Sequence, residues 1–277
     1  MQIFVINLDR KPERWQRMAG LLEGLPFTRI AAVDGKNIDG PEKKGRPYPG
    51  KILSRYQIGC ILSHRAAYES FLKSADRYCC VLEDDVYLSP DFSKFINDDK
   101  WIPSGCDLVK IETTRQQVRF IGRRIGCQGR QAVRLHSLHF GTAGYIISRR
   151  GAEILLEMTT QPDRAMDRIV FGRAVRRRLQ PVYQLIPALC IQGTQRGDGM
   201  IFPEMESSIR DSNAVPRLPA NPTPASSPNP PKIVRVKKSL MEKVRREVSR
   251  PFHQLRAVRK NIAKRIMGVR REGVPFA

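Results

Sequence analysis

The sequence predicts an α/β domain with a mostly parallel sheet and flanking helices, followed by a basic helical tail. Strand-like apolar runs alternate with helical apolar stripes over the first 210 residues, an order typical of α/β domains. The run Tyr78–Leu82 (YCCVL) is continuously apolar, as strands buried in parallel sheets are. The chain has 277 residues, of which 41% are hydrophobic, so it is long enough to bury a sizeable core.

The first half of the domain opens with a short apolar run that predicts a strand over Gln2–Asn7. A helical stripe predicts a helix over Pro12–Leu25, and Thr28–Val33 reads as a second strand before a loop rich in Gly, Pro and Lys. Ser54 and Gln57 are spaced as a capping box, which predicts the start of a long helix.

Further elements follow Tyr78–Leu82. Short helices are expected after Ser89-Pro90 and after Ser148, and a longer one over Asp163–Arg177. The remaining predicted strands are Leu108–Ile111, Val118–Ile125, Gln131–Leu135, Ala143–Ile147 and Val182–Ile186.

Composition divides the chain into three parts: a folded domain over residues 1–210, a linker over 211–231 and a basic tail over 232–277. Seven prolines lie between Pro216 and Pro231, which favours an extended linker. Fifteen Lys and Arg against three Glu give the segment 232–272 a charge of +12, out of +22 for the whole chain. Such a basic chain is expected to meet an anionic partner: nucleic acid, an acidic membrane or a phosphorylated substrate.

Targeting signals and cysteines point to a cytoplasmic protein. No apolar stretch approaches the roughly 18 residues that span a bilayer, and charged residues follow the first short apolar run too soon for a signal peptide. None of the six cysteines forms a C-x-x-C pair. We therefore expect reduced thiols, mostly packed as small apolar side chains, rather than disulfides or a zinc site.

The acidic triplet Glu83-Asp84-Asp85 follows directly on the apolar strand Tyr78–Leu82. Adjacent carboxylates at such a place repel one another, and a divalent cation removes that repulsion. Residues two apart in an extended segment point the same way, so Glu83 and Asp85 are expected to reach one ion. Mg²⁺ and Mn²⁺ prefer such oxygen ligands. The alternative is a solvated turn in which the acids have no function.

The other candidate functional residues are less informative when each is considered alone. Asp9 and Arg10, after the first strand, suit a ribose and a diphosphate, or else form a plain helix start with a surface arginine. The Ser63-His64 pair, within the long helix, faces either a cleft or the interior. Asp163 and Asp167 share one helix face, and each is a candidate general base or a partner of nearby arginines.

Taken in order, these motifs resemble glycosyltransferase family 25, whose bacterial members assemble lipopolysaccharide and lipooligosaccharide. The resemblance covers about the first 210 residues. The segments that carry it are FVINLDRKPERW (Phe4–Trp15), RIAAVDGK (Arg29–Lys36), IGCILSHRAAYE (Ile58–Glu69), CVLEDDV (Cys80–Val86), DLVKI (Asp107–Ile111), GTAGYIISRRGAEILL (Gly141–Leu156) and the stretch from Asp163 to Asp167.

The resemblance implies a GT-A-like, Rossmann-like nucleotide-sugar domain that transfers a sugar with inversion, most commonly galactose from UDP-galactose, to a glycan or lipid-linked glycan. It also implies that Mn²⁺ or Mg²⁺ is held against the donor diphosphate by Glu83, Asp84 and Asp85. Asp85 and Asp167 are then the catalytic candidates, with Asp167 as base or acceptor contact. The donor-binding candidates are Asn7, Asp9, Arg10, Asp34, Ser63, His64 and Asp84.

In the tail, apolar residues recur at three- and four-residue steps among Lys and Arg, with a break expected at Pro251. A basic amphipathic helix suits an anionic membrane surface, which places the enzyme on the cytoplasmic side of the inner membrane. For the tail, the alternative is a segment that is merely solvated. For the whole protein, the alternatives are a basic nucleic-acid-binding protein or metal-dependent nuclease, and a non-catalytic relative of the family. The nucleic-acid alternative lacks a recognisable binding motif, so nucleic acid is the less expected partner.

Overall fold

A computed structural model describes residues 1–39, 53–172, 178–179, 181–195 and 268–277. The chain divides into two compact units, one formed by Met1–Asn213 with Arg270–Ala277 and the other by Ala214–Val269. All helices and strands below belong to the first unit. Among the described residues, no helix combines the length and apolarity needed to cross a bilayer.

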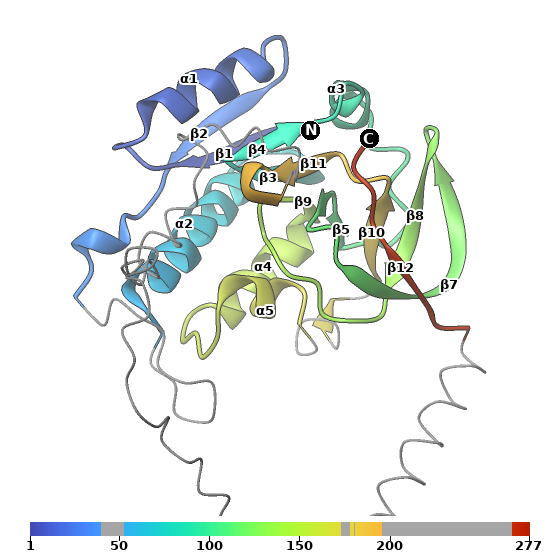
Figure 1. Ribbon diagram of the computed structural model, residues 1–277. Coiled ribbons are helices and arrows are strands. Elements are labelled where there is room, and N and C mark those ends of the chain that lie inside the picture. The colour runs from blue at the N-terminus through green and yellow to red at the C-terminus, as the bar shows by residue number, and fades with distance from the viewer. Residues whose placement is uncertain (40–52, 173–177, 180, 196–267) are drawn as a thin grey trace, which may run out of the picture. The chain divides into compact units, whose positions relative to one another are not determined.

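The first unit is organised around a nine-stranded sheet (Figure 1). In spatial order its strands are β12 (Arg270–Gly273), β7 (Gln117–Cys127), β8 (Arg130–Leu135), β10 (Val182–Ile186), β5 (Leu108–Lys110), β9 (Gly144–Ser148), β3 (Tyr78–Glu83), β1 (Gln2–Asn7) and β2 (Phe27–Ala31). Strand β1 pairs in parallel with both β2 and β3, and β5 pairs in parallel with β10. Strand β9 is inserted antiparallel between β3 and β5.

The predicted α/β class, with a large sheet and flanking helices, is confirmed, but the sheet is mixed rather than mostly parallel. Strands β7, β8 and β12 are antiparallel to their neighbours. The apolar run of β3 reflects burial on both faces of the sheet. An antiparallel neighbour such as β9 leaves that run unchanged, so the run alone does not reveal strand direction.

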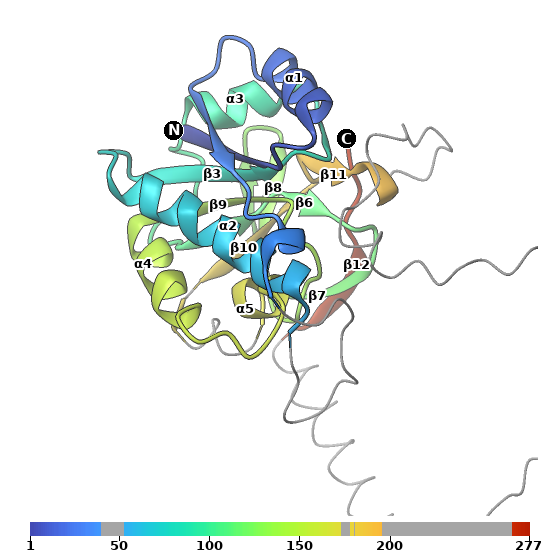
Figure 2. The ribbon, with the colours of Figure 1, turned by 90° about the vertical axis from the view of Figure 1, so that its left-hand side faces the viewer.

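Helices cover both faces of the sheet (Figure 2). Helices α1 (Pro12–Leu21) and α3 (Phe92–Asn97) lie over one face, and α2 (Arg55–Leu72), α4 (Arg149–Met158) and α5 (Met166–Val170) over the other. Successive side chains of β1 point to opposite faces of the sheet, so the strand contributes to both hydrophobic cores. Ile3 packs into the core that contains Met18 of α1, whereas Phe4 packs into the core that contains Phe71 of α2.

The predicted helix starts are largely confirmed. Ser54 and Gln57 form the capping box, with each side chain bonded to the other's backbone N–H. Ser148 caps α4 by accepting from the Gly151 N–H. The short helix expected after Ser89-Pro90 is α3. The helix expected over Asp163–Arg177 is represented by α5, which begins at Met166, so the prediction that Asp163 and Asp167 share a helix face is wrong. Residues 173–177 lie outside the described part.

A second, three-stranded sheet was not expected from the sequence. It consists of β4 (Val86–Leu88), β11 (Cys190–Gln192) and β6 (Glu112–Thr113). Strand β4 follows β3 after the turn at Asp84-Asp85, and Gln192 of β11 lies opposite Val86 of β4. The small sheet therefore brings a residue from far along the chain next to the acidic triplet.

The end of the chain also departs from the sequence prediction, which assigned all of residues 232–277 to the tail. Strand β12 pairs with β7, and the Val274 side chain is buried. The Thr113 hydroxyl donates to the Val274 carbonyl oxygen at 2.5 Å. The last eight residues thus belong to the folded unit, although their charged, alternating pattern resembles the tail. The predicted linker 211–231 and the tail as far as residue 267 lie outside the described residues.

A close backbone contact positions α2 against the loop after β2. A Cβ placed on Gly59 would lie 2.6 Å from the Val33 carbonyl oxygen. We expect Gly59→Ala to lower the free energy of unfolding by about 1–3 kcal/mol, because the backbone must shift to admit the methyl group. Gly20→Ala in α1 is the control: nothing lies within 4 Å of the added carbon, so stability should rise by about 0.5–1 kcal/mol. Urea unfolding measures both, and equal stability of the two variants would contradict this contact.

Candidate active site

A pocket opens where the carboxyl ends of β1, β2 and β3 meet the first half of α2. Because these three strands run in the same direction, their carboxyl ends share one edge of the sheet, the usual place for ligands in α/β folds. The pocket is lined by residues Ile6, Leu8, Arg10 and Arg14, by the loop 32–35, by Tyr56, Cys60, Ser63 and His64 of α2, and by all three acids of the triplet.

Asp84 is held on one side of the acidic turn. Its Oδ2 accepts from Asn7 Nδ2 at 2.7 Å, and its Oδ1 accepts from the Arg14 guanidinium at 3.1 Å. The side chains of Asp84 and Arg14 are 9% and 3% exposed, so this ion pair is buried. Burial raises the pKa of Asp84, against the opposing effects of Arg14 and Asn7. Asp84 thereby joins the turn to β1 and α1.

Glu83 and Asp85 face the other side, as the two-residue spacing predicts. The amide Nε2 of Gln192 lies 3.3 Å from both Asp85 oxygens and 3.5 Å from Glu83 Oε2. Burial raises the pKa of Asp85 to about 8, and the negative charges of Glu83 and Asp84 add to that effect. The two carboxylates therefore meet at one point and repel each other there.

This pair fits an oxygen-loving divalent cation. Two buried carboxylates converge from one turn, and bringing a cation to them would offset both their burial and their mutual repulsion. Carboxylate oxygens are the ligands that Mg²⁺ and Mn²⁺ prefer. Both oxygens of Asp84 are engaged by Asn7 and Arg14, so Glu83 and Asp85 are the members of the triplet best placed to hold the ion.

The other oxygen of Glu83 is directed toward α2 and β9. Its Oε1 accepts from the Thr142 hydroxyl at 2.9 Å and lies 3.4 Å from His64 Nε2. Burial opposes ionisation of Glu83, but the His64 and Thr142 contacts, together with the charge of Lys110, lower its pKa. Glu83 is thus favoured as a carboxylate beside Asp85.

The candidates at the end of β1 occupy three different environments. Asn7 is buried and committed to Asp84 and to Arg29, whose Nε donates to Asn7 Oδ1 at 2.8 Å. Asp9 is exposed, pairs with Arg29 at 2.5 Å and does not line the pocket. Arg10 does line it, and its Nε lies 2.6 Å from Asp34 Oδ2.

Asp34 starts the short 3₁₀ helix η1 (Gly35–Asn37), and its Oδ1 accepts from the Lys36 N–H at 2.9 Å. Burial opposes ionisation, but the Lys36 N–H and the Arg10 guanidinium lower the pKa of Asp34. The side chain therefore stays ionised and fixes Arg10 at the pocket wall.

Ser63 and His64 both line the pocket. Of the two orientations that the sequence left open, the pair therefore has the one that faces a cleft. Ser63 Oγ accepts from the Val33 N–H at 2.9 Å and donates to the Gly59 carbonyl oxygen at 2.7 Å, so it ties α2 to the loop. His64 Nδ1 lies 2.8 Å from the Tyr145 hydroxyl. Both side chains are within 2% of complete burial, so each also has a structural role.

The two aspartates near α5 differ in position. Asp163 is exposed and forms an ion pair with the adjacent Arg164. Asp167, in the first turn of α5, accepts from the Arg168 N–H at 2.7 Å. Burial, followed by the negative charges of Glu83 and Asp167, raises the pKa of the Cys60 thiol. Asp167 does not line the pocket, but its negative charge acts on Cys60, which does.

Sequence reasoning missed four residues of this site: Arg14, Cys60, Thr142 and Gln192. Arg14 reads as an ordinary helix arginine, and Cys60 reads as a small core residue. Gln192 lies 107 positions after Asp85, and no local pattern links the two. Only the four-residue spacing of Cys60 and His64 on one helix face offered a signal, since such pairs are common metal ligands.

Comparisons with known proteins identify the family of this chain. Residues 1–170 match the model of glycosyltransferase family 25, described as an LPS biosynthesis protein family. The lacto-N-neotetraose biosynthesis glycosyltransferase LgtE of Neisseria meningitidis serogroup B is 31% identical over 207 residues, covering 69% of this chain and 74% of the relative. LgtB of Neisseria gonorrhoeae is 32% identical over 211 residues with the same coverage.

One further relative and one solved structure align with other fractions of this chain. The lipooligosaccharide biosynthesis protein lex-1 of Haemophilus influenzae is 31% identical over 52% of each chain. Among solved structures, a glycosyltransferase involved in the glycosylation of the major capsid of PBCV-1 aligns with a TM-score of 0.40 and 11% identity, over 76% of this chain and 96% of that one. The chain belongs to glycosyltransferase family 25 and is a nucleotide-sugar-dependent glycosyltransferase.

The two aspartates of the turn should respond oppositely to neutralisation. We expect Asp84→Asn to lower the free energy of unfolding by about 3 kcal/mol, because it leaves buried Arg14 without that carboxylate. Asp85→Asn should leave stability unchanged or higher, because burial raises the pKa of Asp85 to about 8 and the metal-free side chain is therefore already mostly a neutral acid at neutral pH. Urea unfolding in EDTA at neutral pH measures both. An Asp84→Asn protein as stable as the unaltered chain would show that the Arg14 contact is not what holds the turn.

Proposed function

We propose that this member of glycosyltransferase family 25 transfers galactose from UDP-galactose, with inversion, to a lipopolysaccharide or lipooligosaccharide acceptor. The observation that carries the proposal is the convergence of Glu83 and Asp85 in a pocket that Arg10 also lines. Relatives named for lacto-N-neotetraose and lipooligosaccharide biosynthesis support this acceptor class. The choice of galactose is an expectation from the family resemblance.

Glu83 and Asp85 would hold Mn²⁺ or Mg²⁺ at the carboxyl end of β3. When bound, the ion neutralises the negative charge that develops on the leaving diphosphate. Arg10 also lines the pocket and offers a planar guanidinium that can bind phosphate oxygens in a bidentate manner. Asp34 holds that guanidinium from behind at 2.6 Å. The donor diphosphate would therefore lie between Arg10 and the acidic pair.

Inversion requires the acceptor hydroxyl to attack the anomeric carbon from the side opposite the leaving diphosphate. A carboxylate must take the hydroxyl proton as the bond forms. We assign this role to Asp167, because α5 covers the face of the sheet that bears α2, and the charge of Asp167 reaches the Cys60 side of the pocket. Asp163 is engaged with Arg164 at the surface and is not assigned a role.

We also propose that the basic tail attaches the enzyme to the anionic cytoplasmic face of the inner membrane, where lipid-linked acceptors are found. The support is the sequence pattern of residues 232–267, which lie outside the described part. Each Lys or Arg near such a surface contributes on the order of 1 kcal/mol to attachment. A membrane location would concentrate the enzyme beside its acceptor without changing the chemistry of the pocket.

The metal role is tested by sugar transfer from a panel of nucleotide sugars, with Mn²⁺ or with EDTA. We expect transfer from UDP-galactose that EDTA abolishes. Asp85→Asn should lower kcat at least ~100-fold, because metal stabilisation of the leaving group is worth several kcal/mol. Glu157→Gln is the matched control, since Glu157 of α4 is an exposed carboxylate that pairs with Arg178. Full activity of Asp85→Asn, or of the native chain in EDTA, would refute the metal role. If the chain bound oligonucleotides but no nucleotide sugar, the proposed class of donor would be refuted.

The two aspartates near α5 provide a second test. Asp167→Asn should reduce kcat by about 10²–10⁴-fold with little change in KM for the donor, as expected for loss of a general base. Asp163→Asn should retain activity, because that side chain pairs only with its exposed neighbour in the described structure. Steady-state kinetics with a saturating acceptor distinguish the two. If Asp163→Asn were the damaged variant, the base would be misassigned.

A further inference from the structure

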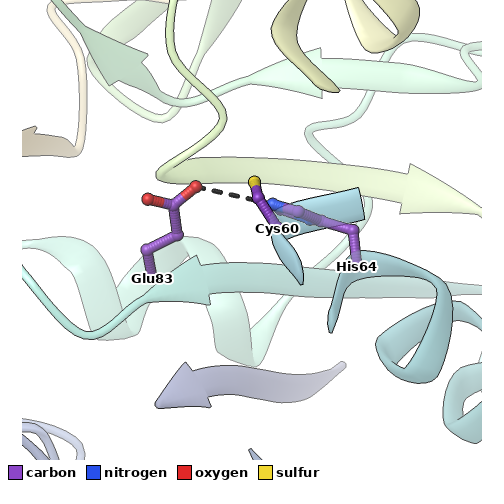
Figure 3. A group of neighbouring side chains, drawn as sticks. All are labelled: Cys60, His64 and Glu83. Carbon is purple, nitrogen blue, oxygen red and sulfur yellow. Dashed lines mark ion pairs between the residues drawn. The ribbon is translucent and has the colours of Figure 1, made fainter. Parts of the chain in front are cut away.

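Three side chains, those of Cys60, His64 and Glu83, converge at the inner wall of the pocket. The proposed reaction assigns no joint role to these three residues. Cys60 and His64 lie four residues apart on one face of α2, and Glu83 reaches them from the end of β3 (Figure 3). One ligand atom from each lies within 4.8 Å of the others. In a tetrahedral zinc site the same atoms lie about 3.5 Å apart, as bond lengths of about 2.0–2.3 Å require. Small rotations about side-chain bonds close that difference.

The two ring nitrogens of His64 face different partners, Nδ1 the Tyr145 hydroxyl and Nε2 the Glu83 carboxylate. Its ring is 1% exposed, and its Nδ1 lies 2.8 Å from the Tyr145 hydroxyl, which in turn lies 2.5 Å from the Tyr68 hydroxyl. Among the described residues, none forms a hydrogen bond with His64 Nε2, and Glu83 Oε1 approaches it to 3.4 Å. A cation bound between Nε2 and the carboxylate would require the tautomer in which Nδ1–H donates to the Tyr145 hydroxyl and Nε2 offers its lone pair to the ion.

The charge around the three side chains also favours a cation. Glu83 contributes one carboxylate, and Asp85 and Asp167 lie close enough for their charges to act on Cys60. The Tyr68–Tyr145–His64 chain resembles the outer hydrogen bonds that orient histidine ligands in metal sites. These features are built from α2, β3 and β9, so the cluster does not depend on a mobile surface loop.

The ligand chemistry selects a different ion from the one assigned to Glu83 and Asp85. Sulfur and imidazole nitrogen are ligands that zinc-class ions bind and that Mg²⁺ and Ca²⁺ avoid. We propose that Cys60, His64 and Glu83 form a second cation site, specific for Zn²⁺ and similar transition-metal ions, with its fourth position open to the pocket. The site goes beyond the proposed function, and its occupancy can be measured without any activity assay.

The two oxygens of Glu83 connect the two sites. Oε1 faces His64 and Thr142, whereas Oε2 faces Gln192 next to Asp85. A zinc-class ion held by Oε1 would draw the shared carboxylate toward α2 and would occupy the wall of the pocket.

Cobalt(II) is the probe, because it takes zinc sites and reports its ligands by absorption. The full chain is freed of metal with EDTA, kept reduced without added thiols, and titrated with Co²⁺. We expect a thiolate-to-cobalt charge-transfer band with the intense visible bands of four-coordinate cobalt, both removed by Zn²⁺. Cys60→Ser should abolish the charge-transfer band and weaken Zn²⁺ binding at least ~10-fold.

Cys127→Ser is the matched control. Its thiol is buried outside the cluster and donates to the Trp101 carbonyl oxygen, which a hydroxyl can also do. The charge-transfer band should persist in this variant. The proposal is overturned if the native chain gives no such band, if Cys60→Ser keeps it, or if Cys127→Ser loses it as well.

A measurement on the unaltered chain covers the case in which Cys60→Ser does not fold. Alkylation of each thiol is followed by mass spectrometry of peptides with and without Zn²⁺. We expect Zn²⁺ to slow alkylation of Cys60 at least ~10-fold while the rates at the five other cysteines change little. Equal slowing at all cysteines, or no slowing at Cys60, would overturn the site.

Discussion

The buried contact of Asp84 with Asn7 and Arg14 determines the geometry of the whole pocket. Three adjacent carboxylates cannot all face one side of a turn without strong repulsion. Because β1 offers an amide and α1 offers a guanidinium on one side, Asp84 is drawn there. Glu83, the last residue of β3, and Asp85, in the turn, both contact Gln192 instead. A structural ion pair thus separates Asp84 from Glu83 and Asp85, the two acids to which the proposed cation is assigned.

The second constraint is the close approach of α2 to the loop after β2. Gly59 leaves room for the Val33 carbonyl oxygen, and Ser63 bonds to the Val33 N–H on the same helix face. One turn of α2 therefore fixes both the loop that carries Asp34 and the histidine that faces Glu83. This wall of the pocket is a helix that is hydrogen-bonded directly to the backbone of the neighbouring loop.

Local signals in the sequence were enough to predict the helix caps at Ser54 and Ser148 and the shared direction of Glu83 and Asp85, because each depends on residues a few positions apart. The antiparallel insertion of β9, the return of β12 to the sheet and the arrival of Gln192 depend on contacts between segments up to about 160 residues apart. No periodicity encodes such pairings. Arg14 was missed for a related reason: its partner Asp84 is 70 positions away.

Glu83 is where the two proposed cation sites meet, and its position explains why the pocket can distinguish ions by ligand type. On the Asp85 side it offers oxygen beside oxygen, which suits Mn²⁺ or Mg²⁺. On the α2 side it offers oxygen beside nitrogen and sulfur, which suits zinc-class ions. Its two oxygens face the two neighbours separately, Oε1 toward His64 and Oε2 toward Gln192. An ion in one site would fix the orientation of the carboxylate that the other site uses, so in this scheme the affinities of the two sites would be coupled.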